Sequence, residues 1–174
     1  MFKQFYPTIY ADSAYIVDFQ LLYEKGFRAV ILDVDNTLVE HGAEANEQAV
    51  AFFRTLRQIG YQTCIISNNH EPRVKPFAEA VESPYIFDAG KPKRKGYLKA
   101  MEICGSSAAD SIFMGDQLFT DIWGANRAGM KSILVKPVSK DTEIQIVLKR
   151  IAERIVLPFY FRYSKNRKEK CTDL

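Results

Sequence analysis

The chain has 174 residues, of which 47% are hydrophobic and 26% are charged. This composition excludes a disordered or fibrous chain, and the length favours one soluble domain. The net charge of +3 lies at the carboxyl end, because residues 162–174 carry five basic and two acidic side chains while the remainder is balanced.

The spacing of the cysteines and the pattern of apolar residues near the amino terminus indicate the cellular compartment. Cys64, Cys104 and Cys171 are far apart and include no Cys-x-x-Cys pair, so the sequence predicts neither a disulfide framework nor a zinc site. Asp12 and Asp18 interrupt the apolar residues near the start, which argues against a signal peptide or a membrane-spanning helix there. We therefore expect a cytoplasmic protein.

Short apolar runs alternate with helical patterns along the chain. Strands are predicted at residues 28–32, 62–67, 85–87, 111–114 and 132–135, and helices at 18–26, 46–59, 71–81, 97–104, in the segment ending near 129, and at about 142–155. Nearly continuous apolar strands are typical of a parallel sheet that is buried on both faces. The sequence therefore predicts one doubly wound, Rossmann-like α/β domain with a central five-stranded parallel sheet and helices on both faces.

Polar side chains follow four of the predicted strands where those strands end. Asp33 and Asp35 follow the first, and they point to the same side because side chains alternate along an extended chain. The later strand ends carry, in order, Ser67, Lys91, and Asp116 with Asp121. The carboxyl ends of parallel strands meet at one edge of a sheet, so we expect these side chains to lie together.

This set of side chains indicates phosphate chemistry. Carboxylates gathered at one point repel one another unless a cation lies among them, and oxygen ligands at a half-open site favour Mg²⁺. A magnesium ion and Lys91 would neutralise phosphoryl oxygens, and Ser67 would hydrogen-bond them. One aspartate can then attack while the other moves a proton.

Taken singly, these residues have other readings. An aspartate after a strand is often a turn residue or a helix cap, and a lone serine is more often a loop hydroxyl than a ligand. Lys91 competes with Lys93 and Lys95 for the role of phosphate-binding lysine, and we favour Lys91 because it directly follows the third strand and precedes a proline. His41 reads as a solvated loop histidine.

The sequence from Gly26 to Val135 resembles the haloacid dehalogenase (HAD) superfamily of aspartate-nucleophile phosphohydrolases. The four motifs of that family correspond in order to Asp33-Val34-Asp35-Asn36-Thr37, Ser67, Lys91-Pro92, and Gly115-Asp116 with Asp121. The Asp-Asn-Thr-Leu form of the first motif, the triplet Ser67-Asn68-Asn69 and the stretch from Gly115 to Asn126 are similar to the YqeG-type, subclass IIIA phosphatases. That group is related to the phosphatidylglycerophosphate phosphatases of mitochondria and plastids.

The resemblance implies a role for each motif residue. Asp33 would be the nucleophile that forms an aspartyl-phosphate, and Asp35 would be the general acid and then the general base. Mg²⁺ would be held by the Asp33 carboxylate, the Asp35 backbone carbonyl and Asp116. Ser67 and Lys91 would bind the phosphoryl group, and Thr37, Asn68 and Asp121 would lie in the second shell or against the substrate. An aspartate at position 35 favours phosphatase over dehalogenase chemistry in this family.

The gaps between the motifs also predict the kind of substrate. The segments 37–67 and 69–91 have room for a helix and a strand each but not for a mobile cap domain, so the site would be open to large substrates. The leading hypothesis is a phosphatase for a lipid-linked phosphomonoester such as phosphatidylglycerophosphate, with no nucleic acid as a partner. The alternatives are a phosphatase for soluble, protein or polynucleotide phosphomonoesters, and a non-enzymatic interaction module, which the complete set of catalytic residue types disfavours.

The carboxyl-terminal segment is read separately from the domain. We expect the catalytic domain to span residues 1–157, with its core at about 26–135, and an aromatic and basic tail to span 158–174. The tail has two interpretations: an interfacial segment in contact with anionic lipid at the inner face of the membrane, or a strand or loop packed on the domain with a frayed, solvated end.

Overall fold

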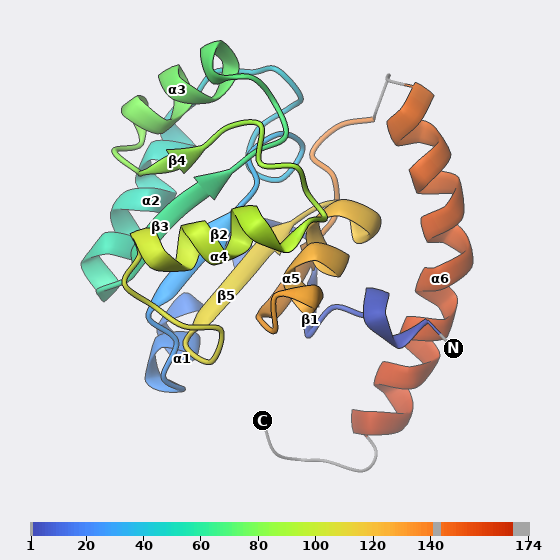
Figure 1. Cartoon of the computed structure of the whole chain (residues 1–174). Helices are drawn as coiled ribbons and strands as arrows, with labels where there is room; N and C mark the ends of the chain where they lie inside the picture. Colours follow the sequence, from blue (N-terminus) through green and yellow to red (C-terminus); the bar gives the residue numbers. More distant parts are fainter. Residues whose placement is uncertain (1, 141–143, 169–174) are drawn as a thin grey trace.

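The computed structural model describes residues 2–140 and 144–168. Its centre is a parallel sheet of six strands in the order β1-β6-β5-β2-β3-β4 (Figure 1). The strands are β1 (Ile9–Ala11), β2 (Ala29–Leu32), β3 (Gln62–Ile66), β4 (Tyr85–Ile86), β5 (Ser111–Gly115) and β6 (Lys131–Val135). The doubly wound α/β fold is confirmed, and within the described ranges no cap domain interrupts it.

The predicted strand count of five was one too low. All five predicted strands are present, and the additional strand, β1, extends the sheet at one edge by pairing with β6 in the register Ile9 to Ile133. Three residues are too few to show a strand period, and this strand is stabilised by a partner more than 100 residues away along the chain.

The helices follow the predicted start and stop signals. They are α1 (Phe19–Glu24), α2 (Glu47–Ile59), α3 (Glu71–Ala80), α4 (Arg94–Ile103), α5 (Trp123–Arg127) and α6 (Ile144–Lys168). The side chains of Asp18 and Asn46 accept hydrogen bonds from backbone amides in the first turns of α1 and α2, and Gly60 ends α2 with a left-handed backbone conformation, as helix caps commonly do.

Alternation along the central strand places side chains into two cores. Val30 and Leu32 of β2 pack with α1, α2 and α3 on one face of the sheet, whereas Ala29 and Ile31 pack with α4 and α5 on the other. Figure 1 shows these two layers of helices. Burial on both faces explains why β2 is apolar at every position.

The order of the strands creates a crevice at the end of β2. After β2 the chain adds β3 and β4 on one side, then crosses to the other side to add β5 and β6. Ligands bind in open α/β sheets at such a switch point, outside the carboxyl ends of the strands. Here that point lies between β2 and β5, which Asp33 and Asp116 follow directly.

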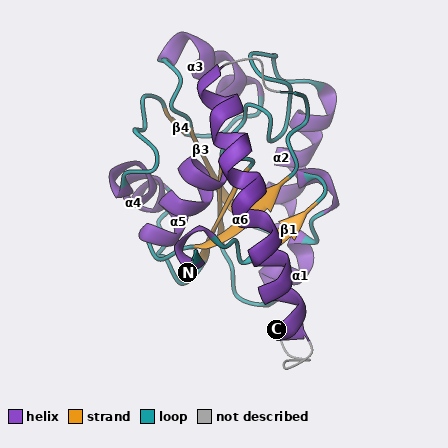
Figure 2. Ribbon diagram, turned by 90° about the vertical axis from the view of Figure 1, so that its right-hand side faces the viewer, coloured by secondary structure: helices purple, strands orange, loops and turns teal. Residues whose placement is uncertain are grey.

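Helix α6 is longer than predicted. It does not end near residue 155 but continues through Pro158 to Lys168, so the predicted domain boundary at 157 falls inside a helix. Its aromatic part packs on the amino-terminal segment through the ring pairs Phe2–Phe159, Tyr6–Tyr160 and Tyr10–Phe161. Figure 2 shows α6 running past the β1 edge of the sheet.

The predicted tail is therefore partly a packed helix rather than a strand or loop, and residues 169–174 lie outside the described part of the chain. Among the described helices, none combines the length and the apolar character that a membrane crossing requires.

Candidate active site

The loop after β2 is a tight, buried turn. The backbone amides of Thr37 and Leu38 donate to the carbonyl of Val34 at 3.1 and 3.0 Å, and Asn36 adopts a left-handed conformation with φ of 57°. This conformation is accessible to asparagine at low cost. The turn leaves Asp33 and Asp35 buried at the edge of the sheet.

Three carboxylates meet at this edge. Asp33, Asp116 and Asp121 are buried, and each offers an oxygen within 4.8 Å of the others. The backbone amide of Gln117 donates to Asp121 at 3.0 Å. Gly115 makes room for this packing, because a Cβ there would lie 2.6 Å from the Asp121 carboxyl carbon.

Lys91 is the lysine at this cluster. Its Nζ lies 2.7 Å from Asp121 Oδ1 and 3.1 Å from Asp33 Oδ1. The Asn68 side chain fixes the backbone of Lys91 from both sides, accepting from its amide at 2.7 Å and donating to its carbonyl at 3.1 Å. Lys93 and Lys95 are exposed, so the structure places Lys91 among the carboxylates and leaves Lys93 and Lys95 outside the cluster.

Burial shifts the acid–base equilibria of the cluster. Desolvation raises the pKa of Asp33 to about 7, against the opposing charge of Lys91. Desolvation and the neighbouring Asp121 also raise the pKa of Asp116 well above its usual value, despite the nearby Arg150. Burial lowers the pKa of Lys91, but Asp121 and Asp33 more than offset this, so its pKa is raised overall and Lys91 stays protonated.

The Asp35 carboxylate is held apart from the other three. Its Oδ1 accepts from the Gly42 amide at 2.8 Å and from Arg73 Nη2 at 2.7 Å, and its Oδ2 accepts from Asn69 Nδ2 at 2.7 Å. Three donors, one each from the loop after β2, the loop after β3 and helix α3, thus fix the orientation of one carboxyl group. The structure does not bring the Asp35 side chain into the carboxylate cluster, which leaves it available for proton transfer.

A polar pocket of about 290 Å³ opens over these residues. Ser67 lines it, and the Ser67 hydroxyl oxygen accepts from the Asn69 amide at 3.1 Å, so the hydroxyl proton can be donated to a ligand. Thr37 lies deeper and its hydroxyl approaches Asp116 Oδ1 at 3.4 Å. His41, read from the sequence as a solvated loop residue, also lines this pocket.

Sequence reasoning missed two arginines and a glutamate. Arg73 reaches Asp35 from α3. Arg150 on α6 forms an ion pair with the Asp116 carboxylate and donates to the Asp116 carbonyl at 2.6 Å. Glu153 accepts from Arg150 at 2.9 Å and from the Leu118 amide at 2.6 Å. No local pattern marks these side chains. Arg150 and Glu153 lie on α6, far in sequence from the motif that they contact. Arg73 follows Ser67 by six residues but lies at a helix position that no motif specifies.

The cluster suits a divalent cation. Its three buried carboxylates supply hard oxygen donors, the type that Mg²⁺ and Ca²⁺ prefer, and within residues 2–140 and 144–168 they form ion pairs with two cations, Lys91 and Arg150. The residues present therefore fit a metal held by Asp33, Asp116 and Asp121. Asp121, for which the family resemblance implied a place in the second shell, lies in the carboxylate cluster itself.

The raised pKa of Asp33 predicts how pH and magnesium affect stability. The folded protein binds this proton up to about pH 7, whereas the unfolded chain releases it near pH 4, so stability should fall as pH rises between these values. Magnesium requires ionised carboxylates and should stabilise the protein more at high pH. We expect a metal-free melting temperature that declines from about pH 5 to about pH 8, and a rise with Mg²⁺ that is larger at about pH 8.

The variant Asp33→Asn provides the matched control, because it removes the titrating group while keeping its shape. Its metal-free melting temperature should depend less on pH, and its response to Mg²⁺ should be smaller. An equal Mg²⁺ response of the unmodified protein at both pH values, or none, would contradict the assignment of this cluster as a metal site.

Comparison with known proteins agrees with this geometry. A family model described as haloacid dehalogenase-like hydrolase matches residues 41–129. The chain is 34% identical over 159 residues to the probable phosphatase YqeG of Bacillus subtilis strain 168, covering 90% of this chain and 92% of that protein. It is 26% identical over 175 residues to phosphatidylglycerophosphate phosphatase 1, chloroplastic/mitochondrial, of Arabidopsis thaliana, covering 91% of this chain but 48% of that protein. It thus spans about half the length of the Arabidopsis relative.

A solved structure shares the fold. The crystal structure of a HAD family hydrolase from Deinococcus radiodurans R1, with bound phosphate and sodium, superimposes with a TM-score of 0.56 at 16% identity, covering 72% of this chain and 88% of that one. The family model and the Bacillus relative support an assignment of family and activity as well as of fold. The chain therefore belongs to the haloacid dehalogenase-like hydrolase family and is a phosphatase.

Proposed function

We propose that this phosphatase is a magnesium-dependent phosphomonoester hydrolase that forms an aspartyl-phosphate on Asp33 and acts on phosphatidylglycerophosphate, or a similar lipid-linked phosphomonoester, at the cytoplasmic face of an anionic membrane. One observation supports the chemistry most directly: Lys91 lies between Asp33 and Asp121 beside the polar pocket. A phosphoryl group bound there would meet a protonated amine and a carboxylate nucleophile together.

The reaction divides into two displacements at phosphorus. In the first, a carboxylate oxygen of Asp33 bonds to phosphorus, the bond to the leaving oxygen breaks, and Asp35 gives its proton to that oxygen. In the second, water gives a proton to Asp35 and attacks phosphorus, and the bond to Asp33 breaks to release inorganic phosphate. Splitting the hydrolysis in this way replaces one difficult step with two easier ones.

Several contacts support these roles. The hydrogen bonds from Gly42, Asn69 and Arg73 hold the Asp35 carboxyl in one orientation, which general acid–base catalysis requires. Lys91 can bind the phosphoryl oxygens as a cation, and Ser67 can donate its hydroxyl proton to them.

The metal would act at the same point. Asp33, Asp116 and Asp121 would hold a divalent cation, joined in our proposal by the backbone carbonyl of Asp35. When bound, Mg²⁺ supplies positive charge that balances the charge developing on the phosphoryl oxygens in the transition state.

Two observations support a lipid-linked substrate over a small soluble one. The described residues contain no cap to close over the pocket, so a substrate anchored in a membrane can reach it. The Arabidopsis relative is named for its action on phosphatidylglycerophosphate, and a second relative of that name, from Chlamydomonas reinhardtii, is 29% identical over 147 residues.

Helix α6 supports a membrane location for this reaction. It carries a stripe of large apolar side chains exposed to solvent, namely Ile144, Leu148, Ile151, Ile155 and Phe159, with exposed basic residues Arg154, Arg162 and Lys165 on the same helix. Apolar and basic residues combined in this way are typical of helices that lie in the interface of an anionic membrane. Ile146 and Lys149 of the same helix line the catalytic pocket, so membrane contact through α6 would hold the pocket near the lipid headgroups.

The two aspartates of the first motif should differ in effect. With p-nitrophenyl phosphate and Mg²⁺, we expect Asp33→Asn to reduce turnover to background, because an amide cannot attack phosphorus. Asp35→Asn should lower kcat by roughly 10² to 10⁴, the range of general acid–base catalysis. Asp88→Asn, at an exposed position outside the pocket, is the control and should leave kcat unchanged. Retained turnover in Asp33→Asn, with the fold intact by circular dichroism, would refute the nucleophile assignment.

The membrane proposal predicts that surface presentation matters. We expect phosphatidylglycerophosphate in anionic vesicles to be hydrolysed far faster than soluble glycerol 3-phosphate, because the surface supplies effective concentration and orientation. Leu148→Glu should lower the rate on vesicles severalfold, with vesicle binding measured by sedimentation.

The matched control is Leu98→Glu on α4, since both leucines lie on helices and are 61% and 46% exposed. This variant should bind vesicles like the unmodified protein. Equal rates for both leucine variants would exclude α6 as the membrane contact. A preference for soluble esters throughout would instead favour the alternative of a soluble-substrate phosphatase.

A further inference from the structure

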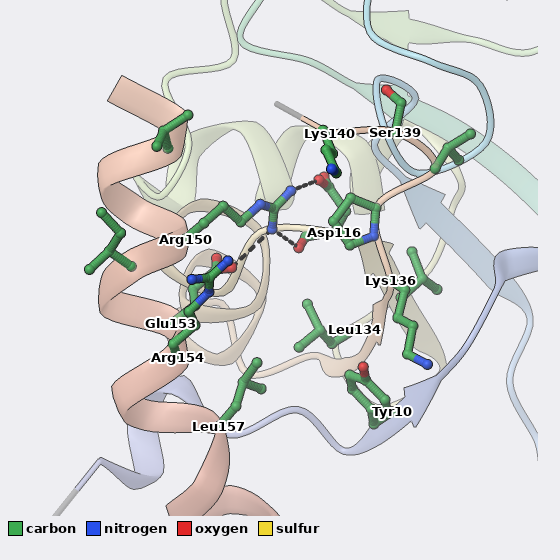
Figure 3. A pocket seen from close by; sticks show the side chains of 15 residues that line it. Tyr10, Asp116, Leu134, Lys136, Ser139, Lys140, Arg150, Glu153, Arg154 and Leu157 are labelled. Atoms are coloured by element: carbon green, nitrogen blue, oxygen red, sulfur yellow. Dashed lines mark hydrogen bonds and ion pairs between the residues drawn. The ribbon is translucent and has the colours of Figure 1, made fainter. Parts of the chain in front are cut away.

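A second hollow, larger than the catalytic pocket, lies under α6. It has a volume of about 700 Å³, within the range of ligand pockets in proteins. One wall is the inner side of α6, and the other is formed by Tyr10 of β1, Leu134 of β6 and the loop to Lys140. Figure 3 shows this groove with Arg150, Arg154 and Leu157 projecting from α6 toward the opposite wall. We call it the α6 groove.

The α6 groove adjoins the active site. Asp116, a member of the carboxylate cluster with Asp33, lines the groove. The same turns of α6 border both hollows, because Ile146 and Lys149 line the catalytic pocket while Val147 and Arg150 line the groove. A substrate with its terminal phosphate at Asp33 could therefore extend into the groove.

The lining combines an apolar surface with excess positive charge. Seven apolar residues line it: Leu134, Val135, Pro137, Val138, Val147, Ile151 and Leu157. Four basic and two acidic side chains line it as well, namely Lys136, Lys140, Arg150 and Arg154 with Asp116 and Glu153.

Two of the cations are already paired. Arg150 is bound to Asp116 and Glu153, and Lys136 lies 2.5 Å from Asp12. Lys140 and Arg154 have no ion-pair partner among the described residues. Their charge is therefore available to an anionic ligand in the groove.

We propose that the α6 groove binds the phosphodiester and the first part of an acyl chain of a glycerophospholipid substrate, with Lys140 and Arg154 facing the diester and the apolar wall facing the chain. This inference rests on the proposed function and adds a binding site to it. The chemistry favours this occupant, because a phosphosugar or a polynucleotide end would leave the apolar wall uncovered. A diacyl phosphodiester uses both the charge and the apolar surface.

The groove is held in place by the network at the metal site. Arg150 and Glu153 tie α6 to the backbone of Asp116 and Leu118, at the loop that carries two of the three clustered carboxylates. The position of the lipid-binding wall is thus fixed relative to the reacting phosphate, as a site that orients a substrate requires.

The test separates groove binding from attachment to a membrane surface by using monomeric substrates. Phosphatidylglycerophosphate analogues with acyl chains of increasing length, from acetyl to hexanoyl, would be assayed below their critical micelle concentrations. We expect kcat/KM to rise by up to roughly fourfold for each methylene that enters the groove, the ratio that corresponds to about 0.8 kcal/mol. Val147→Trp should fill the groove and flatten this dependence on chain length.

Ile103→Trp on α4 is the matched control, because Ile103 and Val147 are both β-branched helical residues that are 40% and 39% exposed. It should keep the chain-length dependence of the unmodified protein.

Arg154→Gln tests the role of charge in the groove. Glycerol 3-phosphate lacks the diester, so the ratio of kcat/KM for the hexanoyl substrate to kcat/KM for glycerol 3-phosphate measures the preference for a diester. Arg154→Gln should reduce this ratio severalfold. Arg54→Gln on α2, also exposed, should leave the ratio unchanged.

The outcomes distinguish this proposal from the proposed function. Hydrolysis of every analogue with no dependence on chain length, or the same dependence in Val147→Trp, would overturn the groove while leaving the lipid phosphatase intact. No hydrolysis of any analogue, with turnover of an aryl phosphate retained, would overturn the lipid substrate and the groove together. Two results together would support the groove as the lipid-binding site. The chain-length dependence would be lost only in Val147→Trp, and the diester preference would be lost only in Arg154→Gln.

Discussion

Three carboxylates, Asp33, Asp116 and Asp121, are buried within 4.8 Å of one another, and this crowding of negative charge is the constraint on which the site depends. Charges so close and so poorly hydrated are costly unless cations lie among them. Lys91 enters the cluster from the β4–α4 loop and Arg150 from α6. Neither is adjacent in sequence to the acids it neutralises, so the complete fold is needed to assemble the site.

Helix α6 contributes to both the substrate-binding surface and the catalytic site. Through Arg150 and Glu153 it is fixed to the loop that carries Asp116 and Asp121, and its other faces border the groove and solvent. A change in the position of α6 would therefore alter the surroundings of Asp116. In our account the same helix contacts the membrane, lines the lipid-binding groove and neutralises a metal ligand, which would couple substrate capture to the state of the metal site.

The site residues that could be predicted from the sequence are those that follow the ends of strands. Asp33, Ser67, Lys91 and Asp116 could be placed together because parallel strands finish at one edge of a sheet, and buried strands such as β2 are readable as apolar runs. Strand β1 could not be found, because its pairing with β6 is long-range. Nor could Arg150 be assigned, since the length and path of α6 are set by tertiary packing, including aromatic contacts with the amino-terminal segment.

Trapping the covalent intermediate would show directly whether Asp33 is the nucleophile. Borohydride reduces an acyl phosphate to an alcohol, so an aspartyl-phosphate would be converted to homoserine and located by peptide mass spectrometry. Quenching the enzyme during turnover with Mg²⁺ and substrate should yield homoserine in place of Asp33, and omitting the substrate should abolish it. Sustained turnover without this product, or with homoserine at another aspartate, would show that Asp33 is not the nucleophile.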